Sequence, residues 1–87
     1  MNWWSAAAWC KANDLHLATM YEICPNWDGN TGYDKCLEAT GIGGAGYVWS
    51  ATANGELYVF TVDMSWGTVR NTNFRHRAGD NATAICL

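Results

Sequence analysis

Four cysteines in a chain of 87 residues restrict the folds open to this sequence more than any other feature. They are Cys10, Cys24, Cys36 and Cys86. Four cysteines allow three pairings, and the sequence alone does not choose among them. Chain order favours a bridge between Cys10 and Cys86, because it would tie an early helix to the last strand. The other two cysteines would then close a short loop. In the loop-entropy model the long bridge would stabilise the fold by about 4.5 kcal/mol and the short one by about 3 kcal/mol.

The same cysteines indicate where the protein works. Disulfides at this density in a small domain are typical of oxidising compartments, so we expect an extracellular, cell-surface or virion-surface location. A structural zinc site usually takes its ligands from close pairs such as C-x-x-C. The closest pair here is Cys24 and Cys36, so we expect two disulfides and no metal or other cofactor.

Size and composition indicate a single small domain over residues 1–87. Six tryptophans, four tyrosines and two phenylalanines can supply the large buried area that so short a chain needs. Five basic against eight acidic residues give a net charge of −3, which argues against a nucleic-acid binder. No apolar run is long enough for a membrane span, so we expect no direct membrane insertion. A helical pattern starts directly after Met1, which fits a domain excised from a longer surface protein.

The first quarter of the chain carries two helical patterns. Residues 2–12 combine an N-capping asparagine with three consecutive alanines, the strongest helix formers. The run 15–20 alternates like a short strand. Thr19 and Glu22 then form a T-x-x-E capping box, which predicts a second short helix over residues 20–24.

A long segment rich in Gly, Asn, Asp and Thr follows, over residues 26–46. It contains D-x-N-x-G-x-D at residues 28–34, with oxygen groups of the kind that Ca²⁺ prefers. An EF-type calcium loop would need glycine at its sixth position and glutamate at its twelfth, where this chain has Tyr33 and Ala39. We therefore expect a turn-rich loop closed by a disulfide. A calcium-dependent carbohydrate-binding lectin is the alternative.

The second half of the chain predicts a small antiparallel sheet. Strands over 47–52 and 56–63 flank an Asn-Gly turn at Asn54, which favours a hairpin. Both faces of the second strand are largely apolar, which predicts a central and buried strand. A short strand over 68–70, a polar loop over 71–81 and a last strand over 82–87 complete the pattern. Two short helices followed by such a sheet indicate an α+β fold.

The order of four short motifs resembles the C-type lectin-like fold over nearly the whole chain. The motifs are W-x-x-A-x-x-W-C-K-A, L-H-L-A-T, Y-V-W-S-A-T and a terminal A-I-C-L. The resemblance is to the compact bacterial and phage members, related to the formylglycine-generating-enzyme group and to variable proteins diversified by retroelements. It implies a bridge between a helical cysteine and one in the last strand, which matches Cys10 and Cys86. It also implies that Trp49 lies in a core strand.

The resemblance further implies a rigid frame with an irregular late segment that makes the contacts. In the retroelement-diversified members the variable positions lie in this stretch. The residue types support a contact role independently, because aromatic and arginine side chains dominate interface energetics and small polar side chains add adaptable hydrogen bonds. We predict a ligand-binding surface formed by Tyr58, Trp66, Arg70, Asn71, Asn73, Phe74, His76 and Arg77, supported by the turn at Asn54.

Such a surface predicts a binding module and not an enzyme. The expected ligand is a protein or another cell-surface molecule, with carbohydrate as an alternative. The module would belong to a diversified variable protein or to the tip of a pilin-like adhesin. No serine or cysteine stands in a recognisable nucleophile motif, so no activity of the formylglycine-generating relatives is carried over and no catalytic residue is predicted. A structural pilus or spike subunit, whose exposed aromatics bury against neighbouring copies, is the other alternative.

Overall fold

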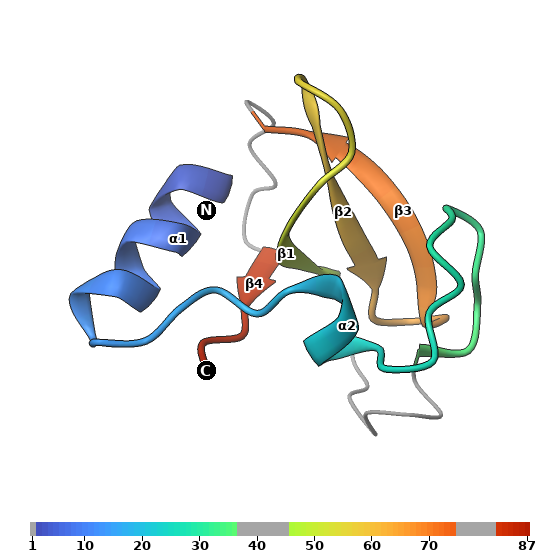
Figure 1. The fold of residues 1–87 in the computed structure, drawn as a ribbon, viewed down its shortest axis with the longest axis horizontal. Coiled ribbons are helices and arrows are strands. Elements are labelled where there is room, and N and C mark those ends of the chain that lie inside the picture. The colour runs from blue at the N-terminus through green and yellow to red at the C-terminus, as the bar shows by residue number, and fades with distance from the viewer. Residues whose placement is uncertain (1, 37–45, 75–81) are drawn as a thin grey trace.

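The computed structural model describes residues 2–36, 46–74 and 82–87, which form two helices followed by a four-stranded sheet (Figure 1). The elements are α1 (Trp3–Ala12), α2 (Met20–Ile23), β1 (Tyr47–Ala53), β2 (Tyr58–Asp63), β3 (Thr68–Asn73) and β4 (Ala82–Ala84). The predicted α+β class is confirmed, with two short helices first and strands later.

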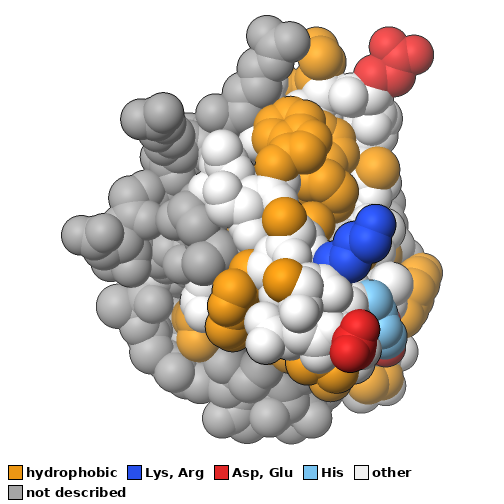
Figure 2. Space-filling view, turned by 90° about the vertical axis from the view of Figure 1, so that its left-hand side faces the viewer, with side chains coloured by type: hydrophobic (Ala, Val, Ile, Leu, Met, Phe, Trp, Pro, Cys, Tyr) orange, Lys and Arg blue, Asp and Glu red, His pale blue; other side chains and the backbone are white. Residues whose placement is uncertain are grey.

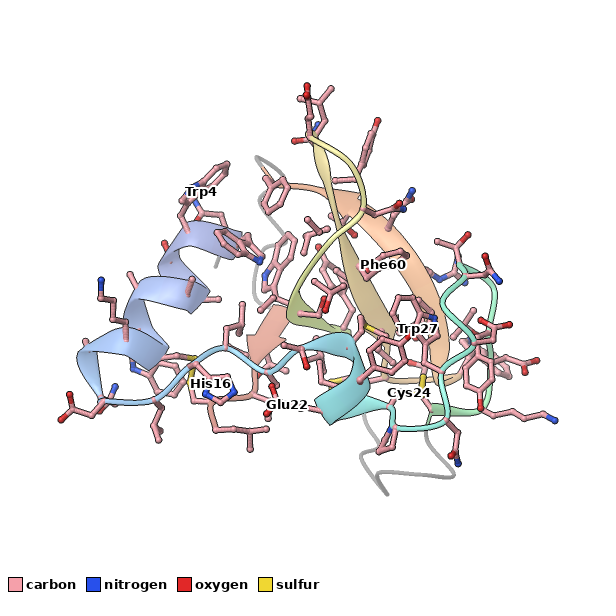
Figure 3. All side chains as sticks on the ribbon, in the orientation of Figure 1. Trp4, His16, Glu22, Cys24, Trp27 and Phe60 are labelled. Atoms are coloured by element: carbon pink, nitrogen blue, oxygen red, sulfur yellow. A yellow bond between two sulfur atoms is a disulfide. The ribbon has the colours of Figure 1, made fainter. Side chains whose placement is uncertain are left out.

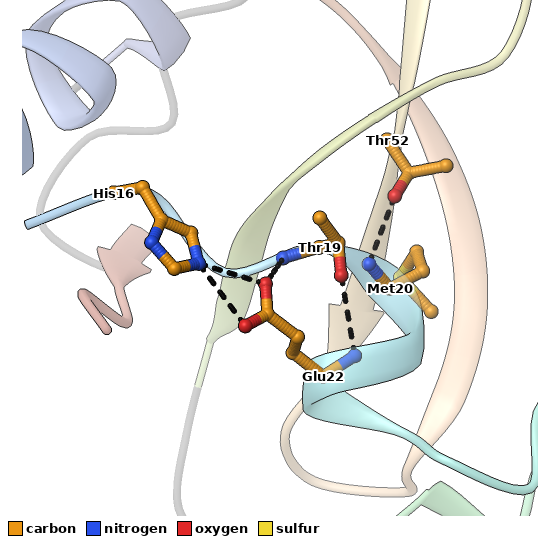
Figure 4. A network of polar contacts seen from close by, with 5 residues as sticks. All are labelled: His16, Thr19, Met20, Glu22 and Thr52. Carbon is orange, nitrogen blue, oxygen red and sulfur yellow. Dashed lines mark hydrogen bonds and ion pairs between the residues drawn. The ribbon is translucent and has the colours of Figure 1, made fainter.

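Both helices begin where the sequence predicts, because side chains satisfy their first N–H groups. Asn2 Oδ1 accepts a hydrogen bond from the Ser5 N–H at 2.8 Å and starts α1. Thr19 and Glu22 form the predicted capping box of α2 (Figure 4). Within the described ranges, no helix has the length and apolar character needed to cross a membrane.

The sheet is mixed, with the strand order β3-β2-β1-β4. β1 pairs with β2 and β2 with β3 in antiparallel fashion, but β4 pairs parallel with β1. The prediction of an antiparallel sheet is therefore wrong for the last strand. β3 ends beside the β1–β2 turn, whereas β4 begins opposite Tyr47, at the far end of β1. The last strand consequently runs in the same direction as its neighbour.

β3 is longer than predicted. The polar stretch 71–81 was expected to be a loop after a strand that ends at Arg70, but the register with β2 continues to Asn73, opposite Tyr58. β3 is an edge strand of the sheet, and an edge tolerates polar residues because one of its sides is not paired with another strand. Asn71 and Asn73 therefore have strand geometry and defined faces.

Other strand boundaries also differ from the prediction. The strand expected over 56–63 begins only at Tyr58, which leaves Glu56 and Leu57 in the hairpin loop. The expected strand over 15–20 is wrong except for one bridge between Leu17 and Cys86. Backbone hydrogen bonds join His16 to Leu87 and Ala18 to Ile85 on either side of this bridge, and the start of α2 at Met20 ends the extended segment. The last expected strand, 82–87, likewise forms continuous pairs only as far as Ala84.

Apolar side chains form two core clusters, one on each face of the sheet. One cluster joins α2 to Phe60 and Val62, and the other joins α1 to Trp49 and Val59. β2 contributes alternate residues to both clusters, as the period of two in a strand requires. This confirms that β2 is central and buried. Trp27 lies against Phe60, with ring centroids 4.6 Å apart (Figure 3).

The two disulfides join Cys10 to Cys86 and Cys24 to Cys36, as predicted. The first holds α1 against the C-terminal segment. The second closes the loop that precedes the sheet. Their Cα atoms are 5.3 and 5.1 Å apart, within the normal range for disulfides.

Glu22 links the start of α2 to the preceding segment through contacts that depend on its charge (Figure 4). Its carboxylate accepts from the Thr19 backbone N–H at 3.0 Å and lies 2.9 Å from His16 Nε2. These contacts favour the ionised form and lower the pKa of Glu22, with the Thr19 hydrogen bond contributing most. The Met20 N–H donates to Thr52 Oγ1 at 2.9 Å and anchors the same helix end to β1.

We expect Glu22→Gln to weaken the dependence of stability on acidic pH. A carboxyl with a lowered folded pKa contributes stability above its unfolded pKa of about 4.3, and this is lost as pH falls through the folded pKa. Glutamine keeps the side-chain acceptor of the capping box but does not titrate. Melting temperatures measured from about pH 7 to about pH 2.5 should therefore fall less steeply in E22Q than in the wild type below about pH 4.5. Glu56→Gln is the control for losing one carboxylate, and identical slopes in wild type and E22Q would contradict the expectation.

Candidate binding surface

An apolar pocket lies at the end of the sheet where β1 turns into β2. The described residues that line it are Trp4, Glu56, Leu57, Asn73 and Phe74. We call the hollow lined by these five residues the tip pocket. Its volume is about 160 Å³ and it opens to solvent. Figure 3 shows Trp4 at the end of α1 that lies beside this end of the sheet.

Three separate parts of the chain contribute to the tip pocket. The first turn of α1 supplies Trp4, the β1–β2 loop supplies Glu56 and Leu57, and the end of β3 supplies Asn73 and Phe74. Helix and strand ends hold side chains more firmly than free loops do. Regular elements hold Trp4 and Asn73, and the other three lining residues lie in the hairpin loop or directly after β3.

Backbone hydrogen bonds hold the β1–β2 loop in place. The Asn54 N–H donates to the Tyr58 carbonyl at 2.8 Å and closes the loop. The Phe74 N–H donates to the Leu57 carbonyl at 3.1 Å and joins the loop to the end of β3. Gly55 has a φ of 83°, a left-handed conformation that glycine adopts without steric cost. The predicted Asn-Gly turn thus sets the position of the pocket.

Three aromatic rings in mutual contact support the pocket. The Trp3 and Phe74 centroids are 5.0 Å apart at 89°, and the Trp3 and Trp4 centroids are 5.9 Å apart at 89°. Trp4 and Phe74 are 5.7 Å apart and tilted by 47°. The Trp3 indole N–H donates to the Ser50 carbonyl at 2.8 Å, which fixes the central ring against β1. Edge-to-face packing at these distances is favourable, so the rings are held in place before any ligand binds.

Much of the apolar surface of the pocket is open to water. Trp4 is 51% exposed and Leu57 is 62% exposed. From the α1 side, hydrophobic side chains gather over the upper part of the surface, and an acidic side chain lies at the upper edge (Figure 2). Contiguous exposed apolar surface beside a hollow is typical of binding sites.

The structure brings four predicted contact residues to this end of the sheet. Asn54 and Tyr58 flank the hairpin loop, and Asn73 and Phe74 line the pocket. Tyr58 is 43% exposed although it begins a buried strand, and it stands opposite Asn73. Asn71 is on the same face of β3 as Asn73, because residues two apart in a strand share a face. The predicted residues His76 and Arg77 lie outside the described residues.

Two predicted contact residues lie elsewhere. Trp66 is 73% exposed, but it belongs to the β2–β3 turn at the opposite end of the sheet. The six residues of β3 separate it from the tip pocket by about 20 Å. Arg70 lies within β3, and its Nε is 3.5 Å from Asp63 Oδ2. The single continuous surface predicted from the sequence is therefore divided, and Trp66 is not part of the tip.

Three pocket residues were not singled out from the sequence, namely Trp4, Glu56 and Leu57. Two adjacent tryptophans at a helix start contain a usable signal, because neighbouring helical residues point about 100° apart and only one can face the core. The position of Leu57 contains a comparable signal. It directly follows the hairpin turn, where the sheet has few apolar side chains that could cover it. Only the fold shows that these residues meet.

The 28–34 segment uses its oxygen atoms within turns. Asp28 Oδ1 accepts from the Asn30 N–H at 2.9 Å, and the Trp27 indole N–H donates to the Asn30 carbonyl at 2.8 Å. The prediction of a turn-rich loop closed by a disulfide is confirmed over residues 24–36. In the part of the chain that the structure describes, no three His, Cys, Asp or Glu side chains gather in a group that could hold a metal ion.

The tip pocket combines an aromatic wall with one carboxylate and one amide. Among the described residues of its lining, Glu56 is the one that carries a charge. The arrangement is thus suited to holding a ligand group against the rings while polar groups orient it. Comparisons of the chain with protein-family models, with curated protein sequences and with solved structures found no match.

Proposed function

We propose that this chain is an extracellular ligand-binding module of the C-type lectin-like kind, and that it binds without catalysing a reaction. The observation that carries the proposal is the tip pocket, an exposed aromatic hollow formed by the start of α1, the β1–β2 loop and the end of β3. Contact with a partner would remove Trp4 and Leu57 from water, which favours association. The two disulfides support an oxidising location.

The proposed contact surface extends from the pocket to its polar neighbours. Asn54, Tyr58 and Asn71 lie around the same end of the sheet and offer hydrogen-bonding groups of the adaptable kind found in antibody loops. His76 and Arg77 follow Phe74 closely in the sequence and belong to the proposal on that ground. The ligand that we propose is a protein or another molecule of a cell surface.

The setting that we propose is a bacterial or phage surface protein, either a retroelement-diversified variable protein or the tip of a pilin-like adhesin. Sequences of this locus from related isolates separate a diversified binder from a fixed one. Diversification requires substitutions concentrated at the late contact positions, with Trp49 and Cys86 unchanged. The positions are Asn71, Asn73, Phe74, His76 and Arg77. An invariant segment would instead indicate a fixed ligand.

We expect Trp4→Ala and Leu57→Ser to weaken ligand binding. Aromatic anchors at the centre of an interface typically contribute 2 kcal/mol or more, so Trp4→Ala should lower affinity about 30-fold and Leu57→Ser about 5-fold. The measurement uses the full chain, biotinylated and assembled on streptavidin so that avidity reveals weak binding. The probes are intact bacterial and animal cells, examined by flow cytometry, and a glycan array.

The chain offers matched controls for this experiment. Trp9 lies on the same helix as Trp4 and is 54% exposed, against 51% for Trp4, but it does not line the pocket. Trp66→Ala removes an exposed tryptophan at the other end of the sheet. If Trp4→Ala binds like the wild type while Trp9→Ala or Trp66→Ala loses binding, the tip pocket is not the contact surface. Binding abolished by a calcium chelator would favour the calcium-dependent lectin instead.

A structural subunit is a second candidate, because Trp66 places a second exposed aromatic group at the opposite end of the sheet. Two unlike apolar surfaces at opposite ends suit head-to-tail association of identical copies. Self-association that rises with concentration and is abolished by Trp66→Ala in analytical ultracentrifugation would favour this candidate. A monomer at all concentrations would exclude it.

A further inference from the structure

We propose that the tip pocket receives a lysine or arginine side chain of a partner protein, held against the rings of Trp4 and Phe74 with Glu56 as its counter-ion. This inference rests on the proposed binding function and names the chemistry of the group that is bound. It follows from the arrangement of the rings, the charge of the lining and the size of the pocket.

The rings form a corner. Trp4 and Phe74 both line the pocket and are tilted by 47° to each other, and Trp3 stands at 89° to each of them. A single flat ring would suit a stacked planar or sugar ligand. Trp4 and Phe74 both line the pocket, so a positively charged group held there lies beside two rings whose electron-rich faces attract cations. Tryptophan gives the strongest such attraction of the three aromatic residues.

The charge of the lining is complementary to a cation. Among the described residues that line the pocket, the ionisable side chain is the acid Glu56. The chain as a whole carries a net charge of −3, which adds a weak long-range attraction for a basic partner.

The size of the pocket favours a single side chain. Pockets for drug-sized ligands have volumes of roughly 300–1,000 Å³. The tip pocket, at about 160 Å³, is well below that range. A lysine or arginine side chain also suits the mixed lining, because its apolar stem can lie along Leu57 while its charged end stays near polar groups and water.

The test uses the isotope-labelled full chain and follows the indole N–H signals of its tryptophans by NMR. The main probe is the peptide acetyl-Gly-Lys-Gly-amide. Its neutral match is acetyl-Gly-norleucine-Gly-amide, which has a similar apolar stem without the charge. We expect the lysine peptide to shift the Trp4 signal in a saturable way, with a Kd of millimolar order, and the norleucine peptide to bind about 3- to 10-fold more weakly.

Variants separate the charge from the aromatic contact. Glu56→Gln should weaken the lysine peptide about 3-fold or more and leave the norleucine peptide unchanged. Asp14→Asn is the matched control, since it removes one carboxylate beyond the other end of α1, at a left-handed position that asparagine tolerates. Trp4→Ala should abolish the saturable shift, which is then followed on the Trp3 signal.

Several outcomes would overturn the inference, each in a different way. Equal binding of the lysine and norleucine peptides would show a purely apolar contact. Tighter binding of methyl glucoside or of choline than of the lysine peptide would assign the pocket to a sugar or to a quaternary ammonium group. A failure of this inference can be distinguished from a failure of the proposed function. If cell binding depends on Trp4 but the lysine peptide does not bind, the cation is wrong and the contact surface stands.

Discussion

Replacing both Cys10 and Cys86 by alanine is expected to lower the free energy of unfolding by about 4.5 kcal/mol. The bridge spans a sequence separation of 76 residues, and the loop-entropy model relates its stabilisation to the length of the closed loop. A domain of 87 residues has a total stability of only about 4–13 kcal/mol. The variant should therefore lose between about one third and all of its stability, with α1 the first element to separate from the sheet. Urea titration followed by far-UV circular dichroism measures the loss.

The second disulfide provides the matched control. Cys24 and Cys36 have a sequence separation of 12, so removing both is expected to lower the free energy of unfolding by about 3 kcal/mol. Each variant removes both sulfur atoms of one bridge, so neither variant has a free thiol. If the short-loop variant loses more stability than the long-loop variant, chain entropy is not the main source of the stabilisation.

Trp49→Ala is expected to lower the free energy of unfolding by about 3–5 kcal/mol. Trp49 is fully buried and is the largest such side chain among the described residues. It packs between α1 and the sheet, with the Tyr47 ring 5.7 Å away. Alanine would leave a cavity that rigid neighbours on both sides fill only in part. For a domain of this size the change corresponds to a fall in melting temperature of about 15 °C or more, measured by calorimetry.

Trp66→Ala is the control for the loss of a tryptophan, because its side chain is 73% exposed. Substitution of such a surface residue usually changes stability by less than about 0.5 kcal/mol. Similar melting temperatures for the Trp49 and Trp66 variants would contradict the packing described for the core beneath α1.

Features that depend on neighbouring residues could be predicted from the sequence. Asn2 and Thr19 start their helices because their side chains reach backbone N–H groups within one turn. The hairpin follows from Asn54 and Gly55 because the turn requires a positive φ at the glycine. The burial of β2 on both sides follows from the apolar residues on both of its faces. Each of these outcomes is set by interactions over a few residues, so the pattern of residue types was sufficient.

Features that depend on pairing between distant segments could not be predicted in this way. The parallel direction of β4 and the extension of β3 to Asn73 depend on which strand edge is open once the others have paired. The tip pocket depends on the same long-range order, because Trp4, Leu57 and Phe74 meet only when α1, the hairpin and the end of β3 are packed together. Trp66 shows the converse, since the residues that join it to the pocket in sequence form the strand β3, which holds the two apart. Residue types and local spacing therefore determined the helices and the hairpin, while strand pairing across the chain decided which exposed aromatics share a surface.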